Sequence, residues 1–194
     1  MAARLRGAQL EAATLDAVAG VFAARGVAAT SVQAAAEAAG FSKTGLLSRY
    51  KTKDSLFAAV TTHSQSLISG ILEEITPVKW GPERDDRAIE LFTGMALASP
   101  GSMALLLAAL TSADDDLRMA LERTVPLIWR IFDSTTVNID TVQMAVLHPD
   151  VFARRVRVVA AIGAIVTVVA ATDSTMPDAY LQPLISEAAR NALG

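Results

Sequence analysis

The sequence predicts an all-α protein, and three observations support this prediction. Apolar residues recur at helical spacing, as Leu15, Val18 and Phe22 do at positions i, i+3 and i+7. Alanine, the strongest helix former, supplies 37 of the 194 residues, whereas aromatic residues make up only 5%. No segment alternates around a two-residue Asn-Gly or Asp-Gly turn, the pattern typical of a hairpin. We therefore expect about nine helices.

Glycines and capping residues delimit the helices of the N-terminal part. Thr30 and Gln33 have the spacing of a capping box, in which the hydroxyl and the amide side chain each bond the other residue's backbone N–H. Ser42 and Thr52 stand where the next two helices begin. The expected helices are about 9–25, ended by Gly26, then 30–39, 43–50, and a fourth from Thr52 to Pro77.

Prolines divide the remainder of the chain. Pro149 and Pro177 stand at first-turn positions of helices, where a missing N–H costs nothing. Pro126 is expected to kink or divide a helix, and Pro183 to bend one. The expected helices are 83–98, 102–110, 114–132, 149–171 and 177–192, with 135–147 short and ambiguous.

The composition excludes several classes of protein. The absence of cysteine excludes a disulfide scaffold, a cysteine-ligated zinc site and a thiol nucleophile. The apolar run 158–171 is shorter than the roughly 20 residues that a membrane span needs, and we find no signal peptide. We therefore expect a soluble, cytoplasmic protein without membrane attachment.

Charge is distributed unevenly along the chain. The formal net charge of −3 divides into +3 over residues 1–55 and −6 over the remainder. Such an asymmetry suggests an anionic partner that binds near the N-terminus. Chance clustering of solvated charges would give a difference of similar size, so a motif has to decide between the two interpretations.

A helix-turn-helix motif lies in the basic segment. Helix 30–39, the turn Gly40-Phe41-Ser42 and helix 43–50 have the required lengths, and the turn contains glycine. The alanines of the first helix permit a close crossing with the second. The exposed side of the second helix carries hydrogen-bonding and cationic side chains, and Gly45 permits close approach to DNA.

Four short stretches resemble the tetracycline-repressor (TetR) family of bacterial regulators. They are FAARG at 22–26, TSV at 30–32, AEAAGFSK at 36–43 and YKTKDSLF at 50–57, at the family's internal spacing. The resemblance implies an N-terminal three-helix DNA-binding domain, residues 1–53, followed by a helical effector-binding and dimerisation domain, residues 54–194. Beyond the first part of the chain, only length and helical pattern match.

The resemblance also implies the residues that bind DNA. They come from the helix-turn-helix and the start of the next helix: Thr30, Gln33, Ser42, Lys43, Thr44, Gly45, Ser48, Arg49, Tyr50 and Lys53. Among them, Tyr50 matches an aromatic that closes the small core, and Lys53 matches a phosphate contact. The chain departs from the family at Thr44-Gly45, where Gly-Thr is common, and at Leu47, where an aromatic is common. We therefore leave Leu47 out of the contact set.

The helices after residue 54 are expected to bind an effector and a second copy of the chain. A pocket between helices would be apolar and rich in methionine, which adapts to irregular ligands. Its candidate residues are Phe92, Met95, Met103, Leu107, Met119, Trp129 and Phe132. In the family the last two helices form the dimer, which implies an interface of Val158, Ile162, Ile165, Val166, Val169, Leu181, Leu184 and Ile185.

Enzymatic chemistry is not expected. We find no Gly-x-Ser-x-Gly, no phosphate-binding Gly-x-x-x-x-Gly-Lys, and no partner at metal spacing for His63 or His148. No cofactor or metal is therefore predicted. The sequence favours a ligand-responsive repressor that binds double-stranded DNA at a palindromic operator as a homodimer, with a small apolar effector of unknown identity. The alternative is a small-molecule-binding helical module whose helix-turn-helix is vestigial.

Overall fold

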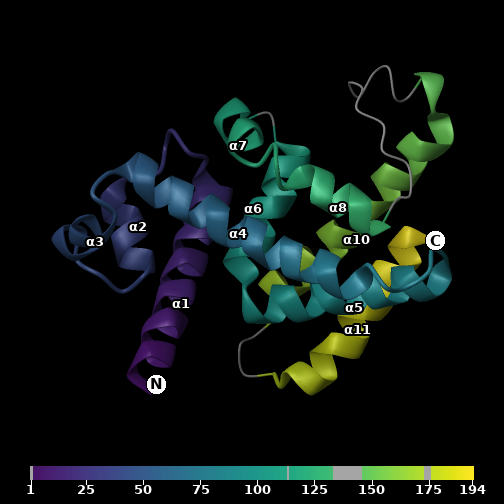
Figure 1. The fold of residues 1–194 in the computed structure, drawn as a ribbon, viewed down its shortest axis with the longest axis horizontal. Helices are drawn as coiled ribbons and strands as arrows, with labels where there is room; N and C mark the ends of the chain where they lie inside the picture. The colour runs from purple at the N-terminus through teal and green to yellow at the C-terminus, as the bar shows by residue number, and fades with distance from the viewer. Residues whose placement is uncertain (1, 113, 133–145, 173–175) are drawn as a thin grey trace. The chain divides into compact units, whose positions relative to one another are not determined.

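The computed structural model describes residues 2–112, 114–132, 146–172 and 176–194. In these ranges the regular secondary structure is entirely α-helical, with no strand, which confirms the predicted fold class (Figure 1). The described helices are α1 Ala2–Arg25, α2 Val32–Ala38, α3 Lys43–Tyr50, α4 Lys53–Ile75, α5 Pro82–Ala98, α6 Pro100–Thr111, α7 Asp115–Ala120, α8 Val125–Phe132, α10 Pro149–Ala171 and α11 Asp178–Leu193.

Most expected boundaries are confirmed to within two residues. The first helix differs, because α1 starts at Ala2 rather than near Gln9. The expected helix 114–132 is divided into α7 and α8, and Pro126 stands in the first turn of α8. There its missing N–H is no loss. Pro183 lies inside α11, which continues through it. The ambiguous segment 135–147 lies almost wholly outside the described residues.

The chain packs as two compact units, each described here by itself. The first comprises residues 1–66 and 99–122, so it holds α1 to α3, the first part of α4, α6 and α7. The second comprises residues 67–98 and 123–194. The segment expected to bind DNA therefore shares its packing unit with α6 and α7, which come much later in the sequence.

In the first unit, α1 and α6 cross at a pair of glycines. A Cβ atom on Gly101 would overlap the backbone carbonyl of Asp16, and one on Gly20 would lie 3.5 Å from the Gly101 Cα. The Asp16 carboxylate accepts hydrogen bonds from the backbone N–H groups of Gly101 at 3.2 Å and Ser102 at 2.7 Å. Asp16 thus satisfies two of the donors that the start of α6 leaves unpaired.

Asp114 makes a similar connection between α7 and the turn after α1. One carboxylate oxygen accepts from the Leu117 N–H at 3.1 Å and so caps α7. The other accepts from the Val27 N–H at 3.2 Å. Gly26, with φ of 77°, leaves room for this carboxylate, since a Cβ there would lie 2.9 Å from it. The start of the helix-turn-helix is thereby fixed to α7.

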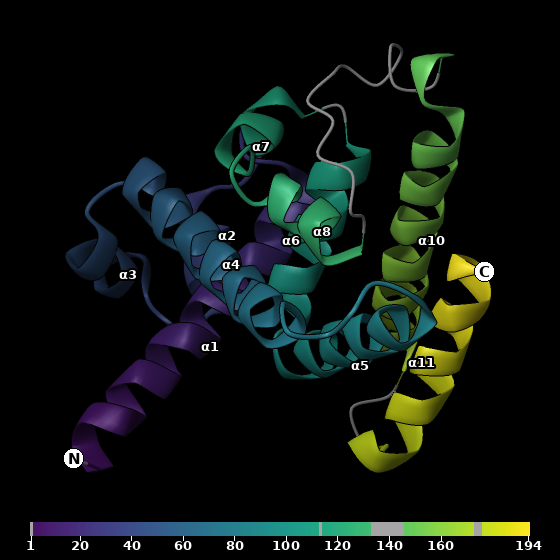
Figure 2. The same ribbon diagram turned by 45° about the vertical axis from the view of Figure 1, so that its right-hand side comes forward.

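In the second unit, α10 and α11 run antiparallel side by side, and both contact α5 (Figure 2). Val158, Ile162 and Ile185 lie in the core they form and are at most 1% exposed. The buried hydroxyls of Ser186 on α11 and Thr93 on α5 pair at 3.3 Å. The three helices therefore share one apolar core.

A buried arginine joins three further segments of this unit. Arg84 on α5 is 4% exposed, and its guanidinium donates to four backbone carbonyls. The acceptors are Ile75 and Val78 at 2.7 Å each, Ile131 at 2.9 Å and Arg130 at 3.2 Å. These carbonyls lie at the ends of α4 and α8, where orphan acceptors and the negative pole of the helix dipole favour a cation.

Two neighbours complete the surroundings of this guanidinium. The Trp80 ring lies 3.9 Å from the Arg84 guanidinium carbon, in cation–π geometry. Burial lowers the pKa of Arg84, and the adjacent Asp85 carboxylate raises it. Arg154 on α10 pairs with Asp85 and donates to the Phe132 carbonyl at 3.2 Å. The last three carbonyls of α8 therefore all bond to arginine.

Most residues of the predicted dimer interface are buried within their own unit. Five of its eight residues are at most 7% exposed because they fill the core of their own unit: Val158, Ile162, Ile165, Leu181 and Ile185. Val166 and Val169 are half-buried, and Leu184 is 60% exposed. Of the eight predicted residues, Leu184 is thus the one that is exposed, and Val156 and Tyr180 are further exposed apolar residues on α10 and α11.

The predicted effector residues are also redistributed. Met103, Leu107 and Met119 belong to the first unit, and the other four belong to the second. Met119 is 63% exposed. Phe92 and Phe132 are buried with their ring centroids 5.4 Å apart, and they pack as core.

No single helix among the described residues is both long and apolar enough to cross a membrane. The helices α5 and α6 pass the same test of length and composition only when they are taken together across the break between them.

Replacement of Arg84 by methionine keeps the volume but leaves four buried carbonyls without their donor. We expect R84M to lower the free energy of unfolding by about 3 kcal/mol or more, measured by urea titration. R87M is the matched control, because Arg87 is 44% exposed on the same helix and pairs only with Glu74 and Glu90. It should lose less than about 1 kcal/mol. Equal losses would show that Arg84 has no special role.

Candidate nucleic-acid interface

The helix-turn-helix consists of α2, a short turn and α3, which pack on each other (Figure 1). Gly40 has φ of 72°, a left-handed conformation that glycine adopts without strain. The Phe41 N–H donates to the Ala36 carbonyl at 2.8 Å and closes the end of α2. Ala35 and Ala36 are buried, as a close crossing of the two helices requires.

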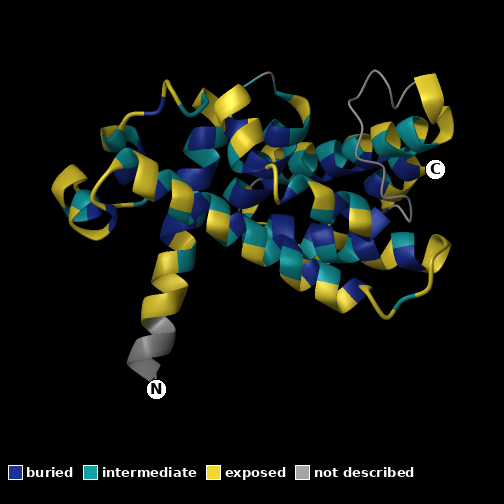
Figure 3. Cartoon of the chain, turned by 45° about the horizontal axis from the view of Figure 1, so that its top comes forward, coloured by how far each residue is buried: buried dark blue, intermediate teal, exposed yellow. Residues whose placement is uncertain are grey.

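The recognition helix α3 has one buried face and one exposed face. Leu46 and Tyr50 point into the core, at 1% and 9% exposure. The Ser42 hydroxyl caps the helix by accepting from the Gly45 N–H at 3.0 Å, as predicted. The predicted contact residues Lys43, Thr44, Ser48 and Arg49 are all exposed. Exposed and buried positions alternate along the helices of the chain (Figure 3). These four side chains are therefore accessible to solvent.

These side chains differ in the hydrogen bonds and ion pairs that they make within the protein. Lys43 and Thr44, in the first turn, make no side-chain hydrogen bond or ion pair to any described residue. The Ser48 hydroxyl donates to the Gly45 carbonyl at 2.8 Å. Lys51, which the sequence interpretation did not select, donates to the Ser48 carbonyl at 2.8 Å and ends the helix with φ of 63°. Cationic groups thus lie at both ends of α3.

The predicted capping box at the start of α2 is wrong. Ser31 is the N-cap, and its hydroxyl accepts from the Ala34 N–H at 3.1 Å. Thr30 is 2% exposed and donates to the Gly26 carbonyl at 2.7 Å, so its hydroxyl faces away from solvent and from any phosphate. Gln33 is exposed and donates to Glu37 at 2.6 Å.

The predicted start of the fourth helix is confirmed. Thr52 and Ser55 exchange backbone-to-hydroxyl hydrogen bonds of 3.1 Å, a reciprocal cap. The Lys53 ammonium donates to the Ala28 carbonyl at 3.1 Å. Lys53 is therefore held against the turn between α1 and α2, beside the helix-turn-helix.

Tyr50 lies at the last turn of α3. Its hydroxyl is buried and has no hydrogen-bond partner among the described residues. Burial raises the pKa of Tyr50, the Glu11 carboxylate raises it further, and Arg49 lowers it. Tyr50 therefore acts as a core residue, and its hydroxyl is not displayed on the surface of α3.

An ion pair connects α3 with α1. The Arg49 guanidinium lies 3.9 Å from the Glu11 carboxylate, and the two side chains are 36% and 51% exposed. The sequence interpretation missed Glu11, because no local pattern indicates which residue of a later helix lies beside it. This carboxylate is the acidic neighbour of the recognition helix in the first unit.

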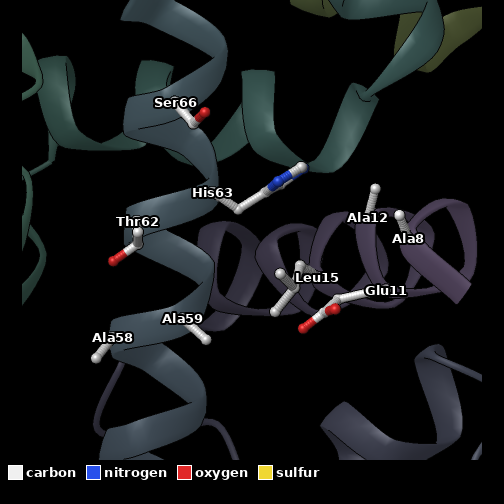
Figure 4. A pocket seen from close by; sticks show the side chains of 9 residues that line it. All are labelled: Ala8, Glu11, Ala12, Leu15, Ala58, Ala59, Thr62, His63 and Ser66. Atoms are coloured by element: carbon white, nitrogen blue, oxygen red, sulfur yellow. The ribbon is translucent and has the colours of Figure 1, made fainter. Parts of the chain in front are cut away.

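A groove of about 490 Å³ lies between α1 and the first half of α4 (Figure 4). Four alanines and Leu15 form the apolar part of its wall, and the polar side chains Glu11, Thr62, His63 and Ser66 stand along it. The residues predicted to bind an effector do not contribute to this groove. No cluster of three or more His, Asp or Glu suited to a metal ion occurs within the described ranges.

This geometry defines a helix-turn-helix protein with an accessible, hydrogen-bonding and cationic recognition helix, the arrangement by which such proteins read DNA. Residues 15–60 match the family described as bacterial regulatory proteins, tetR family. The match covers the helix-turn-helix and confirms the resemblance to the TetR family that the motifs predicted.

Solved structures extend the similarity to the whole fold. The chain is 24% identical to a TetR-like transcriptional regulator from Rhodococcus sp. RHA1, with a TM-score of 0.55 and 95% of each chain covered. It is 22% identical to a TetR-family member from Streptomyces coelicolor A3, with a TM-score of 0.60, over 93% of this chain and 89% of that one. At these identities the likeness shows the fold. Among curated proteins, none matches the chain significantly.

Two substitutions at Tyr50 separate its ring from its hydroxyl. Y50F removes a buried hydroxyl that has no partner, so the free energy of unfolding should stay unchanged or rise by up to about 1 kcal/mol. Y50A removes the ring and should cost about 3 kcal/mol. Urea titration measures both. A large loss in Y50F would show that the hydroxyl is bonded in solution.

Proposed function

We propose that the protein is a homodimeric repressor, acting in the cytoplasm, that binds a palindromic operator and is released by a small apolar effector. The observation that carries the proposal is the exposed face of α3, where Lys43, Thr44, Ser48 and Arg49 supply donors and positive charge. Arginine and lysine suit guanine edges and phosphates, and hydroxyls suit either. The +3 charge of residues 1–55 would attract DNA to this part of the chain.

The open face of α10 and α11 supports the homodimer. Val156, Tyr180 and Leu184 are 51%, 71% and 60% exposed. Ala160 is exposed and Gly163 half-buried on α10, and small residues of this kind permit close helix approach. Exposed large apolar side chains on both helices are compatible with an interaction site. A dimer would place two recognition helices on half-sites about 34–36 Å apart.

The effector part of the proposal is restricted by the packing. An effector that releases DNA must bind the DNA-incompetent state more tightly than the competent one. Phe92 and Phe132 are already packed as core. Met95 is buried as well. In the second unit we therefore infer that the effector contacts the half-buried Trp129, whose ring stacks with Arg155 at 4.9 Å. An apolar or aromatic ligand suits these side chains.

Binding to DNA from upstream of the protein's own gene tests the regulatory function. The double variant K43A/R49A should lose the preference for that fragment over a scrambled duplex, because both side chains project from α3. Fluorescence anisotropy at several salt concentrations measures the ratio. K79A is the control, since Lys79 is an exposed lysine outside the helix-turn-helix. Failure of the unchanged protein to bind, or an unaltered preference in K43A/R49A, would contradict the proposal and favour the small-molecule-binding module.

The dimer is tested by a charge placed on its proposed surface. L184E would bury an unpaired carboxylate, so we expect the dimer dissociation constant to rise by about 30-fold or more. Sedimentation equilibrium measures it. Q182E adds the same charge two residues away, on another side of α11, and should leave association unchanged. A monomeric unchanged protein, or equal effects of the two variants, would contradict the interface.

A further inference from the structure

Glu11 is placed to influence what the recognition helix binds. It lies on α1, far from α3 in sequence, and its carboxylate is 3.9 Å from the Arg49 guanidinium. The other described carboxylate of α1, Asp16, is held by the backbone of α6. Glu11 is 51% exposed and is free to leave the pair. The ion pair between Glu11 on α1 and Arg49 on the recognition helix α3 can therefore break and re-form.

The field of Glu11 reaches two consecutive residues at the end of α3. Besides its pair with Arg49, it raises the pKa of the neighbouring Tyr50, and Arg49 has the opposite effect. The end of a helix also carries the negative pole of its dipole, which favours a cation there. Arg49 is thus attracted by two negative groups of the protein before any DNA is present.

DNA must compete with these groups for the guanidinium. An exposed ion pair of this geometry is weak, so a good acceptor can displace it. A phosphate carries a full negative charge and would meet the Glu11 carboxylate close by, whereas the N7 and O6 acceptors of guanine are neutral. The carboxylate should therefore penalise phosphate contacts by Arg49 more than base contacts.

We propose that Glu11 is a specificity-determining residue, which holds Arg49 away from the phosphate backbone and so lowers the affinity for DNA of arbitrary sequence. The proposal rests on the proposed DNA-binding function and concerns the same site. Electrostatic contacts to phosphates supply most non-specific affinity, and these are the contacts that Glu11 opposes. Loss of the carboxylate should consequently strengthen binding while weakening discrimination.

The experiment is a double-mutant cycle with E11Q, R49A and E11Q/R49A in the full chain. The probes are a fluorescent duplex of scrambled sequence and the fragment from upstream of the gene, titrated over a range of salt concentrations. E11Q should bind the scrambled duplex about fivefold more tightly at low salt, and its salt slope should steepen by up to about one unit. The ratio of the two affinities should fall. In the R49A background, E11Q should change much less.

The matched control is E37Q. Glu37 is an exposed carboxylate on α2 of the same unit, and it pairs with Gln33 instead of Arg49. E37Q removes the same charge as E11Q, so its effect on DNA affinity should be the same with and without Arg49. Thermal melts confirm that E11Q stays folded, as expected for an exposed side chain.

The outcomes distinguish the two proposals. A steeper salt slope and lower discrimination in E11Q that depend on Arg49 support the role of Glu11. An E11Q effect equal to that of E37Q, or unaltered by R49A, overturns it while DNA binding stands. If the unchanged protein binds neither duplex, the proposed function falls and the role of Glu11 falls with it.

Discussion

The arrangement of the helices depends on one constraint: the backbone N–H and C=O groups at the helix ends need hydrogen-bond partners. Many helices within a short chain leave many backbone groups unpaired, and buried ones must find partners. Here side chains supply them: Asp16 from α1 at the start of α6, Asp114 as the N-cap of α7, and Arg84 from α5 at the ends of α4 and α8. In each case the sign of the charge opposes the helix dipole. Each pairing also fixes one helix to another, so capping and tertiary packing are the same interaction.

The same constraint positions the helix-turn-helix within the first unit. Asp114 holds the Val27 backbone, and Thr30 bonds back to Gly26, so the turn before α2 is fixed at both ends. Lys53 holds the far side of the same turn through Ala28. The motif is therefore rigid where it joins the unit, and its exposed face is built on a fixed base. Precise placement of this kind is what a reader of base edges needs, because a small displacement breaks hydrogen bonds to DNA.

Local features were predictable from the sequence, and the identity of distant partners was not. Ser42 and Gly40 were assigned correctly because a cap and a left-handed turn depend on neighbouring residues. The cap of α2 was misassigned, because Thr30 and Ser31 are equally suited to it and a carbonyl of the preceding turn selects between them. Ile162 was assigned to the dimer because α10 is apolar on most sides, and periodicity cannot say which neighbour covers which side. Glu11 had no local signal at all.

Formal charge becomes informative only once the geometry is known. Of the acidic residues in the basic segment, Asp16 is bonded by backbone amides and Glu37 by a side-chain amide. Neither carboxylate faces the first turn of α3, where Lys43 and the unpaired N–H groups of the helix start carry the same sign. Glu11 instead opposes Arg49 at the last turn. The first turn of the recognition helix therefore carries the cation Lys43. At its end Glu11 pairs with Arg49 beside the further cation Lys51, so the carboxylate offsets only part of the positive charge there.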